Sequence, residues 1–594
     1  MKRKFTSVAV LMMTAVIAGC SAGSAASASV PSAAASETAA SVSGMTAGTY
    51  EETVSGHNGD VHVSVTLSED GITDIQIGDN SETLGLGTKA MDLVRGRILK
   101  ANSTDVDTVA GATISSAVLK SAVNNAISEA GGDPASLTAN AEEAVKYEDT
   151  KTQVVVVGSG SAGLAAALQA HQNGNDVILL EQLGLLGGSS LRAGYYIGGD
   201  TKVEEAAGDI FTADDFTNLL VTSNPDQTEE AEILGKRAGD SINWVYDMGM
   251  TDVYYDAGSV YGKGLHWGKD AGIGAYAVSA MQNEMDEEGI DYRVDSRVTS
   301  LINEDGRVTG VNVETKDGQK YSITADAVIL ATGGFAANDD MAKEYTPELT
   351  GLTYDASKGA DGSGMLMAED AGAALDNMSD VINYYGINVI YNGVPRNITY
   401  PYLMNGMVIV NNAGRRFINE TAYYLKDTVD AMRAQDNEET YIILSKDMLD
   451  AVCVPAHDYS SNKEVMYTEC ASVDETAEKF GIDASGLKET LETYNSYVDG
   501  GEDKDFGNIA VASGNKYDLN GPFYVAKVAP CRHMNYGGIR TDLDQHVLTA
   551  DNEVIPGLYA AGECTHIMLN GIGTNTISLV QGRVAADTVS SELN

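Results

Sequence analysis

The sequence predicts an α/β protein built from several domains, and three observations support this fold class. The chain has 594 residues, which is more than one hydrophobic core usually serves. Its hydrophobic fraction of 43% and its 63 glycines suit a turn-rich globular protein. An apolar run at 154–157 leads into a glycine-rich turn, a helix of small residues and a second apolar run at 177–180, which is the order of a βαβ unit.

The composition argues against some classes of function. A formal net charge of −47 disfavours nucleic acid as a partner, because the chain and the phosphate backbone would repel each other. The same charge provides no field that would attract an anionic substrate. The cysteine spacings match no zinc ligand pattern, so we expect no metal site.

The first 20 residues have the pattern of an export signal. A basic start precedes an apolar stretch at 8–18 that is too short to span a bilayer. The stretch ends at Cys20 in a sequence that resembles a bacterial lipobox, although a secretory signal with a chance cysteine is an alternative. We expect a lipoprotein signal peptide at 1–20 and a flexible tether at 21–47. Lipid on Cys20 would anchor the protein at the extracytosolic face of the bacterial cell membrane.

Residues 48–132 predict a small α+β domain. Alternating apolar residues at 61–67 and a further run at 72–77 predict a strand pair, and helices are expected around 88–99 and 115–130. Between the helices lies Asp107-Thr-Val-Ala-Gly-Ala-Thr113. Thr113 opens the second helix, where the N-terminal amides favour a phosphate. An ordinary helix cap is the alternative role for this threonine.

This unit resembles the FMN-binding domain of sodium-pumping and electron-bifurcating membrane complexes. There a transferase attaches FMN through a phosphoester to the threonine of an Asp-x-x-[Ser/Thr/Ala]-Gly-Ala-Thr motif. The resemblance implies covalent FMN at Thr113, with Asp107 as the motif acid. A second family signature is matched upstream at Glu82-Thr-Leu-Gly85.

The βαβ unit carries the residues that a dinucleotide requires. Gly158-Ser-Gly160-Ser-Ala162-Gly163 forms its turn, and Glu181 ends its second strand. The glycines let the backbone approach a pyrophosphate at the helix N-terminus, and Glu181 can accept hydrogen bonds from ribose hydroxyls. The sequence therefore predicts a dinucleotide cofactor here.

Later segments resemble FAD proteins of the fumarate reductase and succinate dehydrogenase class. These segments are 187–190 after the acid, a second contact strand at 327–335, a C-terminal strand at 555–563, and 573–578 at the start of the last helix. The resemblance implies non-covalent FAD, bound by the residues Gly158, Gly160, Ala162, Gly163, Glu181, Gly188, Ser189, Thr332, Gly333, Gly334, Glu563, Thr576, Ile577 and Ser578.

The same resemblance implies a division into domains. A Rossmann-like FAD-binding domain is expected at 150–345 and 511–594, with an α+β capping domain inserted at 346–510. The small FMN-binding domain precedes both. This order is that of exported fumarate- and urocanate-reductase-like enzymes, which respire organic acceptors in anaerobic respiration.

The expected active site departs from the family pattern. In fumarate reductases an arginine that protonates the substrate follows Gly-[Lys/Arg]-Arg-Phe-x-Asn-Glu, but here the leader at 414–420 is followed by Tyr424 at that position. Gly571 replaces a second arginine that clamps a carboxylate, a capping-domain histidine falls near Tyr384, and His533 alone remains of a histidine pair. A buried carboxylate without its guanidinium loses several kcal/mol. Fumarate, and for the same reason urocanate, is therefore disfavoured.

Tyrosines take the place of the missing arginines. Residues 420–424 resemble the Asn-Glu-x-x-x-Tyr stretch of 3-ketosteroid dehydrogenases, where a tyrosine transfers a proton. With a pKa near ~10, tyrosine can act as a general acid at neutral pH. We expect FAD to deliver hydride to the β-carbon of a polarised C=C bond and Tyr424 to protonate the α-carbon. Tyr384, Tyr524 or a backbone N–H would hold the activating carbonyl, and His533 is a further catalytic candidate. Tyr423 is the alternative donor, and a packed aromatic is the alternative role for Tyr424.

Together these features predict an extracytosolic flavin-dependent oxidoreductase acting on CH–CH groups. It would reduce an α,β-unsaturated carbonyl or arylalkene, with electrons relayed through FMN from a membrane-associated donor. A flavin transferase would act on it during maturation. Three alternatives remain open: a urocanate- or fumarate-type carboxylate reductase, a dehydrogenase running in reverse, and a lipoprotein that only carries electrons.

Overall fold

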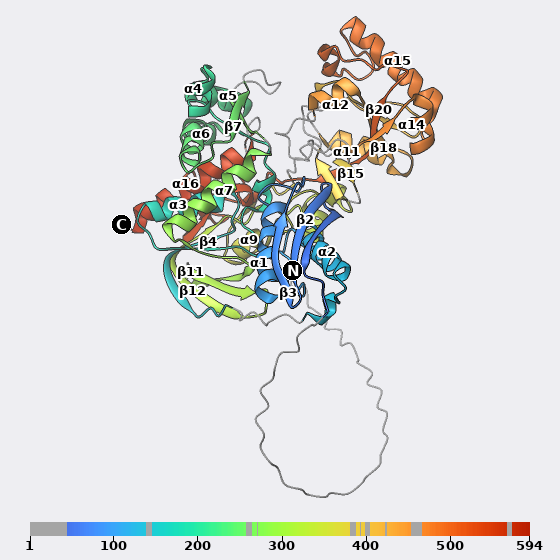
Figure 1. Ribbon diagram of the computed structural model, residues 1–594. Coiled ribbons are helices and arrows are strands. Elements are labelled where there is room, and N and C mark those ends of the chain that lie inside the picture. The colour runs from blue at the N-terminus through green and yellow to red at the C-terminus, as the bar shows by residue number, and fades with distance from the viewer. Residues whose placement is uncertain are drawn as a thin grey trace, which may run out of the picture. The chain divides into compact units, whose positions relative to one another are not determined.

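Figure 1 shows the computed structural model of the chain. The structure describes residues 44–137, 145–256, 264–269, 271–379, 388–391, 394–397, 404–421, 425–452, 466–566, 569 and 573–593. These residues fall within one compact unit, Val42–Asn594. Within the described part of the chain, no helix is both long and apolar enough to cross a membrane. Five positions named above lie outside the described residues, so the expectations for them stay predictions: Cys20, Tyr384, Tyr423, Tyr424 and Gly571.

The N-terminal domain pairs an antiparallel sheet with two helices. Its elements are β1 (Gly48–Ser55), β2 (Asp60–Ser68), β3 (Gly71–Ile77), α1 (Gly87–Ala101) and α2 (Thr113–Glu129). The strand order is β1-β2-β3, and the inward-facing Val61, Val63 and Val65 of β2 are at most 1% exposed. The sequence predicted only the strand pair β2–β3. It missed β1 because this edge strand has no buried residue and so carries little apolar signal.

The FAD-domain sheet has eight strands among the described residues. Its path is β10-β11-β12-β4-β5-β9, with β24 on β12 and β23 on β24. The bounds are β4 (Thr150–Val157), β5 (Val177–Leu180), β9 (Asp291–Arg293), β10 (Ser296–Glu304), β11 (Arg307–Thr315), β12 (Lys320–Leu330), β23 (His546–Leu548) and β24 (Val554–Ala560). Parallel pairing joins β24, β12, β4, β5 and β9, so the C-terminal segment completes the sheet that the βαβ unit begins.

Three helices pack together against this sheet. They are α3 (Ser161–Gln172), α7 (Ile273–Glu288) and α16 (Thr574–Leu593), which lie side by side in Figure 1. The small residues of α3 allow this close packing, because Ala165, Ala166 and Ala167 are fully buried in the cluster that joins the three helices to the sheet. The first turns of α3 and α16 thus belong to one packed body.

A smaller subdomain adjoins this body. Its strands β6, β8 and β7 pair in that order, and three helices accompany them. The bounds are β6 (Tyr195–Ile197), α4 (Lys202–Ala207), α5 (Ala213–Ser223), α6 (Thr228–Asp247), β7 (Val253–Asp256) and β8 (Leu265–Gly268).

The capping domain contains its own sheet, of six strands within the residues described. The order is β16-β15-β20-β18-β17, with β19 on β20. The strands are β15 (Asn388–Tyr391), β16 (Val394–Asn397), β17 (Val408–Asn411), β18 (Thr440–Ser445), β19 (Thr468–Cys470) and β20 (Phe523–Ala529). The accompanying helices are α11 (Leu425–Arg433), α12 (Lys446–Val452), α14 (Val473–Phe480) and α15 (Ala484–Gly500).

The structure shifts both expected limits of the capping domain, 346 and 510. Strand β20 lies beyond 510 yet pairs with β15, β18 and β19. At the other limit, α9 (Ser363–Asp370) packs into the FAD-domain core through Met365, Met367 and Ala368. An apolar strand or helix does not specify its partner in sequence, which explains both differences. The remaining elements at this junction are α8 (Asp339–Tyr345), β13 (Thr353–Tyr354), β14 (Leu375–Asp376), β21 (Cys531–Arg532) and β22 (Gly538–Ile539).

Candidate active site

The glycine-rich turn after β4 is shaped by close backbone contacts. Gly158 has a φ of +98°, and a Cβ on it would lie 2.4 Å from the carbonyl oxygen of Ala331. A Cβ on Gly163 would lie only 1.8 Å from the carbonyl oxygen of Gly158. These contacts require glycine at both positions and bring the start of α3 against the strand. The turn therefore presents backbone amides at a helix N-terminus, as a pyrophosphate requires.

Glu181 is held rigidly at the end of β5. Its Oε2 accepts hydrogen bonds from Ser159 N at 3.1 Å and Ser159 Oγ at 2.5 Å, and its Oε1 accepts one from Leu183 N at 2.7 Å. Burial raises the pKa of this carboxyl despite these donors. This carboxylate stands at the end of β5, where a ribose hydroxyl of a bound dinucleotide can donate to it.

A large cavity, the FAD cavity, runs from this turn to the C-terminal segment. Most of the residues expected to contact FAD line it, together with His533. They are Gly158, Gly160, Ala162, Glu181, Gly188, Ser189, Thr332, Gly333, Glu563 and Ser578. Glu181, the glycine-rich turn and the start of α16 thus face one space, and the residues present fit a dinucleotide.

Four of the residues expected to contact FAD lie behind the lining of the FAD cavity and support its walls. Gly163 packs α3 on the strand, and Gly334 leaves room for Glu563, since a Cβ there would lie 2.4 Å from Glu563 Oε1. Thr576 is buried, and its Oγ1 accepts a hydrogen bond from Ile197 N at 3.0 Å. Ile577 is fully buried in the core. These side chains hold the cavity walls in place and do not line the cavity.

A cluster of ionisable groups lies in the wall of the FAD cavity. His533 Nδ1 lies 2.7 Å from Asp355 Oδ1. Burial lowers the pKa of His533, but the charge and hydrogen bond of Asp355 outweigh burial, so the pKa is raised. Burial also raises the pKa of Glu563 to about 7, although Asn535 N donates a hydrogen bond to it at 3.2 Å. The cluster can hold and exchange protons beside the cofactor.

Asp355 and Arg192 are among the cavity residues that sequence reasoning missed. Arg192 Nη1 donates to the carbonyl oxygen of Asp355 and, at 3.1 Å, to that of Ala356. Both side chains line the FAD cavity. Neither stands in a motif, so no local signal marked them.

The predicted residue Tyr524 and the core residue His266 lie elsewhere. Tyr524 belongs to β20 of the capping domain, where its hydroxyl donates to Glu469 Oε2 at 3.1 Å. It does not line the FAD cavity, and its catalytic role stays a prediction. His266 is fully buried, and its Nε2 lies 2.6 Å from Thr201 Oγ1. Burial lowers the pKa of His266 to about 4, as expected of a core histidine.

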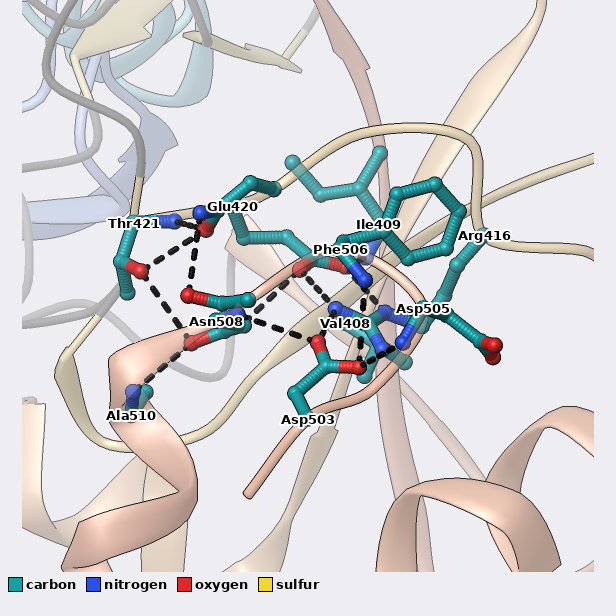
Figure 2. Close-up of polar contacts among 12 residues, drawn as sticks. Val408, Ile409, Arg416, Glu420, Thr421, Asp503, Asp505, Phe506, Asn508 and Ala510 are labelled. Carbon is teal, nitrogen blue, oxygen red and sulfur yellow. Dashed lines mark hydrogen bonds and ion pairs between the residues drawn. The ribbon is translucent and has the colours of Figure 1, made fainter. Parts of the chain in front are cut away.

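A buried ionic network precedes the segment that carries Tyr423 and Tyr424 (Figure 2). Arg416 donates to Glu420 through Nε at 2.8 Å and Nη2 at 2.6 Å, and to Asp503 through Nη2 at 2.8 Å. Asn508 Nδ2 and Ile409 N donate to the same Glu420 carboxylate, at 2.8 and 3.1 Å. Burial lowers the pKa of Arg416, but the two carboxylates outweigh it and keep the charge in place. The network fixes the backbone at Glu420.

The FMN motif forms an exposed helix start. Thr113 is the first residue of α2 and is exposed, and Ala112 before it provides no side-chain cap. Glu82 of the upstream signature accepts hydrogen bonds from His57 N at 2.6 Å and from Ser115 Oγ. An exposed threonine at a helix start whose preceding residue provides no side-chain cap fits a phosphoester.

Asp107 forms an exposed ion pair across the domain boundary. Its Oδ2 lies 3.0 Å from Lys316 Nζ, and Arg97 Nη1 donates to its carbonyl oxygen at 2.9 Å. The hydrogen bond and charge of Lys316 lower the pKa of Asp107. The motif acid therefore helps to orient the loop that leads to Thr113.

Comparisons with known proteins match the two domains that carry these residues. A family model described as FAD binding domain matches residues 153–574, and one described as FMN-binding domain matches residues 56–128. Urocanate reductase of Eggerthella lenta is 30% identical over 97% of this chain and 96% of its own length. NADH:fumarate oxidoreductase of Klebsiella pneumoniae is 29% identical over 89% of this chain, which spans 57% of that relative. An open conformation of a flavocytochrome c3 fumarate reductase superposes with a TM-score of 0.64 at 28% identity, over 77% of this chain and 84% of that one.

Two nucleotide-binding domains with complete motifs define a flavin-dependent oxidoreductase. The chain belongs to the FAD-binding-domain family of fumarate and urocanate reductases, with an FMN-binding domain at its N-terminal side.

Proposed function

We propose that this protein is a reductase of activated C=C bonds that receives electrons through FMN attached at Thr113. The observation that carries the proposal is the pairing of a complete FAD cavity with tyrosine at the position of the proton-donating arginine. Its relatives named as fumarate and urocanate reductases act on activated alkenes, which supports the reaction class. The acceptor of this chain is a neutral or aromatic alkene activated by a carbonyl.

Each of the residues at the site has a separate role in the proposed reaction. FAD, when bound, supplies the hydride. Tyr424 protonates the α-carbon, and Glu420, fixed by Arg416, anchors the backbone that leads to this tyrosine. The pair His533 and Asp355 holds a proton in the cavity wall, where a neighbouring positive charge favours reduced flavin.

The substrate class follows from the missing guanidinium groups. Positions that carry arginine in fumarate reductases are Tyr424 and Gly571 here, so a bound carboxylate would lack its partners. A carbonyl needs only a hydrogen-bond donor, which a tyrosine provides. A panel of enones, cinnamates, urocanate and fumarate tests this. Stopped-flow reoxidation of the reduced enzyme should be fast with enones or cinnamates, and fast reoxidation by fumarate would contradict the proposal.

The role of Tyr424 is tested by a Tyr424→Phe variant, with Tyr423→Phe as the matched control. Loss of general acid catalysis costs about 10²–10⁴-fold in rate. We expect that loss for Tyr424→Phe with FAD still bound, and near-normal turnover for Tyr423→Phe. The reverse pattern would assign the proton to Tyr423, and normal turnover in both variants would exclude this segment.

A urocanate-type carboxylate reductase is the second candidate function. The urocanate reductase of Eggerthella lenta matches this chain over nearly its whole length, which favours it. The same substrate panel separates the two candidates. A dehydrogenase running in reverse is distinguished by reduction of bound FAD when a saturated ketone is added without any donor.

We also propose that the protein works at the extracytosolic face of the membrane, with a membrane-associated donor and a flavin transferase as partners. The basic start, the apolar stretch and Cys20 support this location. A Cys20→Ser variant should appear in the soluble fraction without lipid mass. An unchanged membrane fraction would overturn the anchor.

A further inference from the structure

A second cavity lies where the FMN-binding domain meets the FAD-binding domain. It has a volume of about 570 Å³, within the ~300–1,000 Å³ typical of small-molecule sites. His57, Leu86, Ala110 and Gly111 line it from the N-terminal domain. Ala110 and Gly111 belong to the motif that ends at Thr113, so the cavity begins beside the attachment loop.

The two domains are closely packed around this cavity. A Cβ on Gly184 would lie 3.2 Å from both Ala110 N and Val109 Cγ1, and Leu185 is buried in the core of the N-terminal domain. The motif loop therefore packs on residues 182–191, the segment that directly follows Glu181. The ion pair of Asp107 with Lys316 lies on the same boundary.

The FAD-binding domain lines the second cavity with three cationic side chains, Arg192, Lys358 and Arg532, and with the two acids Asp339 and Asp355. One of the cations is incompletely satisfied. Arg532 is 5% exposed and pairs with Asp339, yet its buried Nε has no hydrogen-bond partner among the described residues. A buried donor left unsatisfied is destabilising, and an acceptor atom of a ligand would relieve this cost. Cationic donors beside leucines suit a planar ring that becomes anionic on reduction.

The second cavity and the FAD cavity share one wall. The residues that line both are Gly188, Arg192, Asp355, Ala356 and Ser357. Hydrogen bonds join the two segments that form this wall. Arg192 donates to the backbone at 355–356, and Ser357 N donates to Ser189 Oγ at 3.0 Å. The wall is therefore a fixed partition between two neighbouring cavities.

We propose that the second cavity holds the ring of the flavin attached at Thr113, with the FMN-binding domain docked there during turnover. This deepens the proposed function and rests on its FMN relay. Electrons cross the shared wall while the domain stays in place: the Thr113 flavin is oxidised, and FAD is reduced by the same two electrons. The protons released at the first flavin and taken up at the second exchange with solvent.

A disulfide across the boundary tests whether docking is permanent. Val109→Cys with Gly184→Cys places two thiols where Val109 Cγ1 and a Cβ on Gly184 would be 3.2 Å apart, which is within disulfide reach. Flavin on the Thr113 peptide is first verified by mass. After reduction with dithionite, transfer to FAD and reoxidation by the acceptor are followed by stopped flow. We expect the rates of electron transfer to FAD in the disulfide form and in the thiol form of the double variant to agree within about twofold.

The outcomes separate the two proposals. A disulfide that slows transfer more than tenfold, with recovery on thiol reduction, would show that the domain must move and would overturn the docking proposal. A Thr113 peptide without flavin in the wild-type protein would instead overturn the proposed function. If the double variant alone fails to carry flavin, the Arg532→Gln variant tests the docking proposal in its place.

An Arg532→Gln variant tests the cavity without touching the motif. Loss of the cation should lower the reduction potential of the Thr113 flavin, by about 30 mV for each tenfold loss of preference for its reduced form. The FAD potential, isolated in a Thr113→Ala variant, provides the reference. Arg540→Gln is the matched control, since Arg540 pairs with Asp376 and lines neither cavity. An unchanged potential in Arg532→Gln, or an equal fall in Arg540→Gln, would overturn the assignment.

Discussion

Adjacent arginines in the capping domain offer a matched test of the buried network. Arg416 has a 5% exposed side chain and bonds two fully buried carboxylates, whereas Arg415 is 48% exposed and pairs with Glu489, itself 63% exposed. Breaking a buried ion pair by removing one partner costs about 3–5 kcal/mol. An exposed pair contributes about 0–1 kcal/mol. Arg416→Leu should therefore destabilise the capping domain by several times more than Arg415→Leu.

Hydrogen exchange in peptides from β17 and β18 measures this difference directly. At about 1.4 kcal/mol for each factor of ten, Arg416→Leu should speed exchange by roughly 100- to 4,000-fold, and Arg415→Leu by less than about sixfold. Equal effects of the two variants would refute the reasoning, because the network would then contribute no more than a surface pair.

The stability cost of Arg416→Leu should change with pH, and the direction of the change follows from the charges in the network. Burial raises the pKa of Asp503, but Arg416 outweighs burial and lowers it, so in the wild type this carboxylate stabilises the fold at neutral pH and less so in acid. Without Arg416, burial raises the pKa of Asp503 and only the backbone N–H groups of Asn508 and Phe506 oppose it, so protonation of Asp503 becomes easier. The stability cost of Arg416→Leu should therefore shrink as the pH falls from neutral into the acid range, where Asp503 can take up a proton.

Three further predictions concern the two cofactor sites. Gly163→Ala should abolish FAD retention, measured by flavin absorbance after gel filtration, because its Cβ would lie 1.8 Å from Gly158 O; full retention would contradict the packing argument. Thr113→Val should remove the covalent flavin while FAD stays bound, as seen by fluorescence of the denatured chain. His533→Gln should remove a proton-linked break above pH 6.5 from the FAD reduction potential, because Asp355 outweighs burial and raises the pKa of His533 from 6.5. A break that persists in this variant would assign it to another group.

Much of the FAD site could be predicted from the sequence because its signals are local. Gly158, Gly160 and Glu181 stand at fixed distances along one βαβ unit, and the structure places all three on one cavity. The general fold followed from the same patterns, confirmed by the FAD- and FMN-binding family matches.

The rest depends on contacts between distant segments. Arg192, Asp355 and Arg532 reach the cavities through tertiary packing, and no spacing in the sequence marks them. The membership of β20 in the capping sheet is of the same kind, because its run of apolar residues would suit either sheet. Burial and partner choice decide these positions, and both emerge only when the chain is folded.

The parts of the sequence that supply the FAD cavity walls have a consequence for which substitutions this protein can tolerate. Within the described chain, no residue that lines the cavity lies between Met367 and His533, although that interval contains the whole capping sheet. The residues that line the FAD cavity are thus encoded outside the stretch that forms the capping sheet. Substitutions can therefore accumulate in that sheet without touching a residue of the cavity lining. Exchanging this interval between relatives would accordingly measure what the capping domain contributes to acceptor preference while the flavin-binding residues stay unchanged.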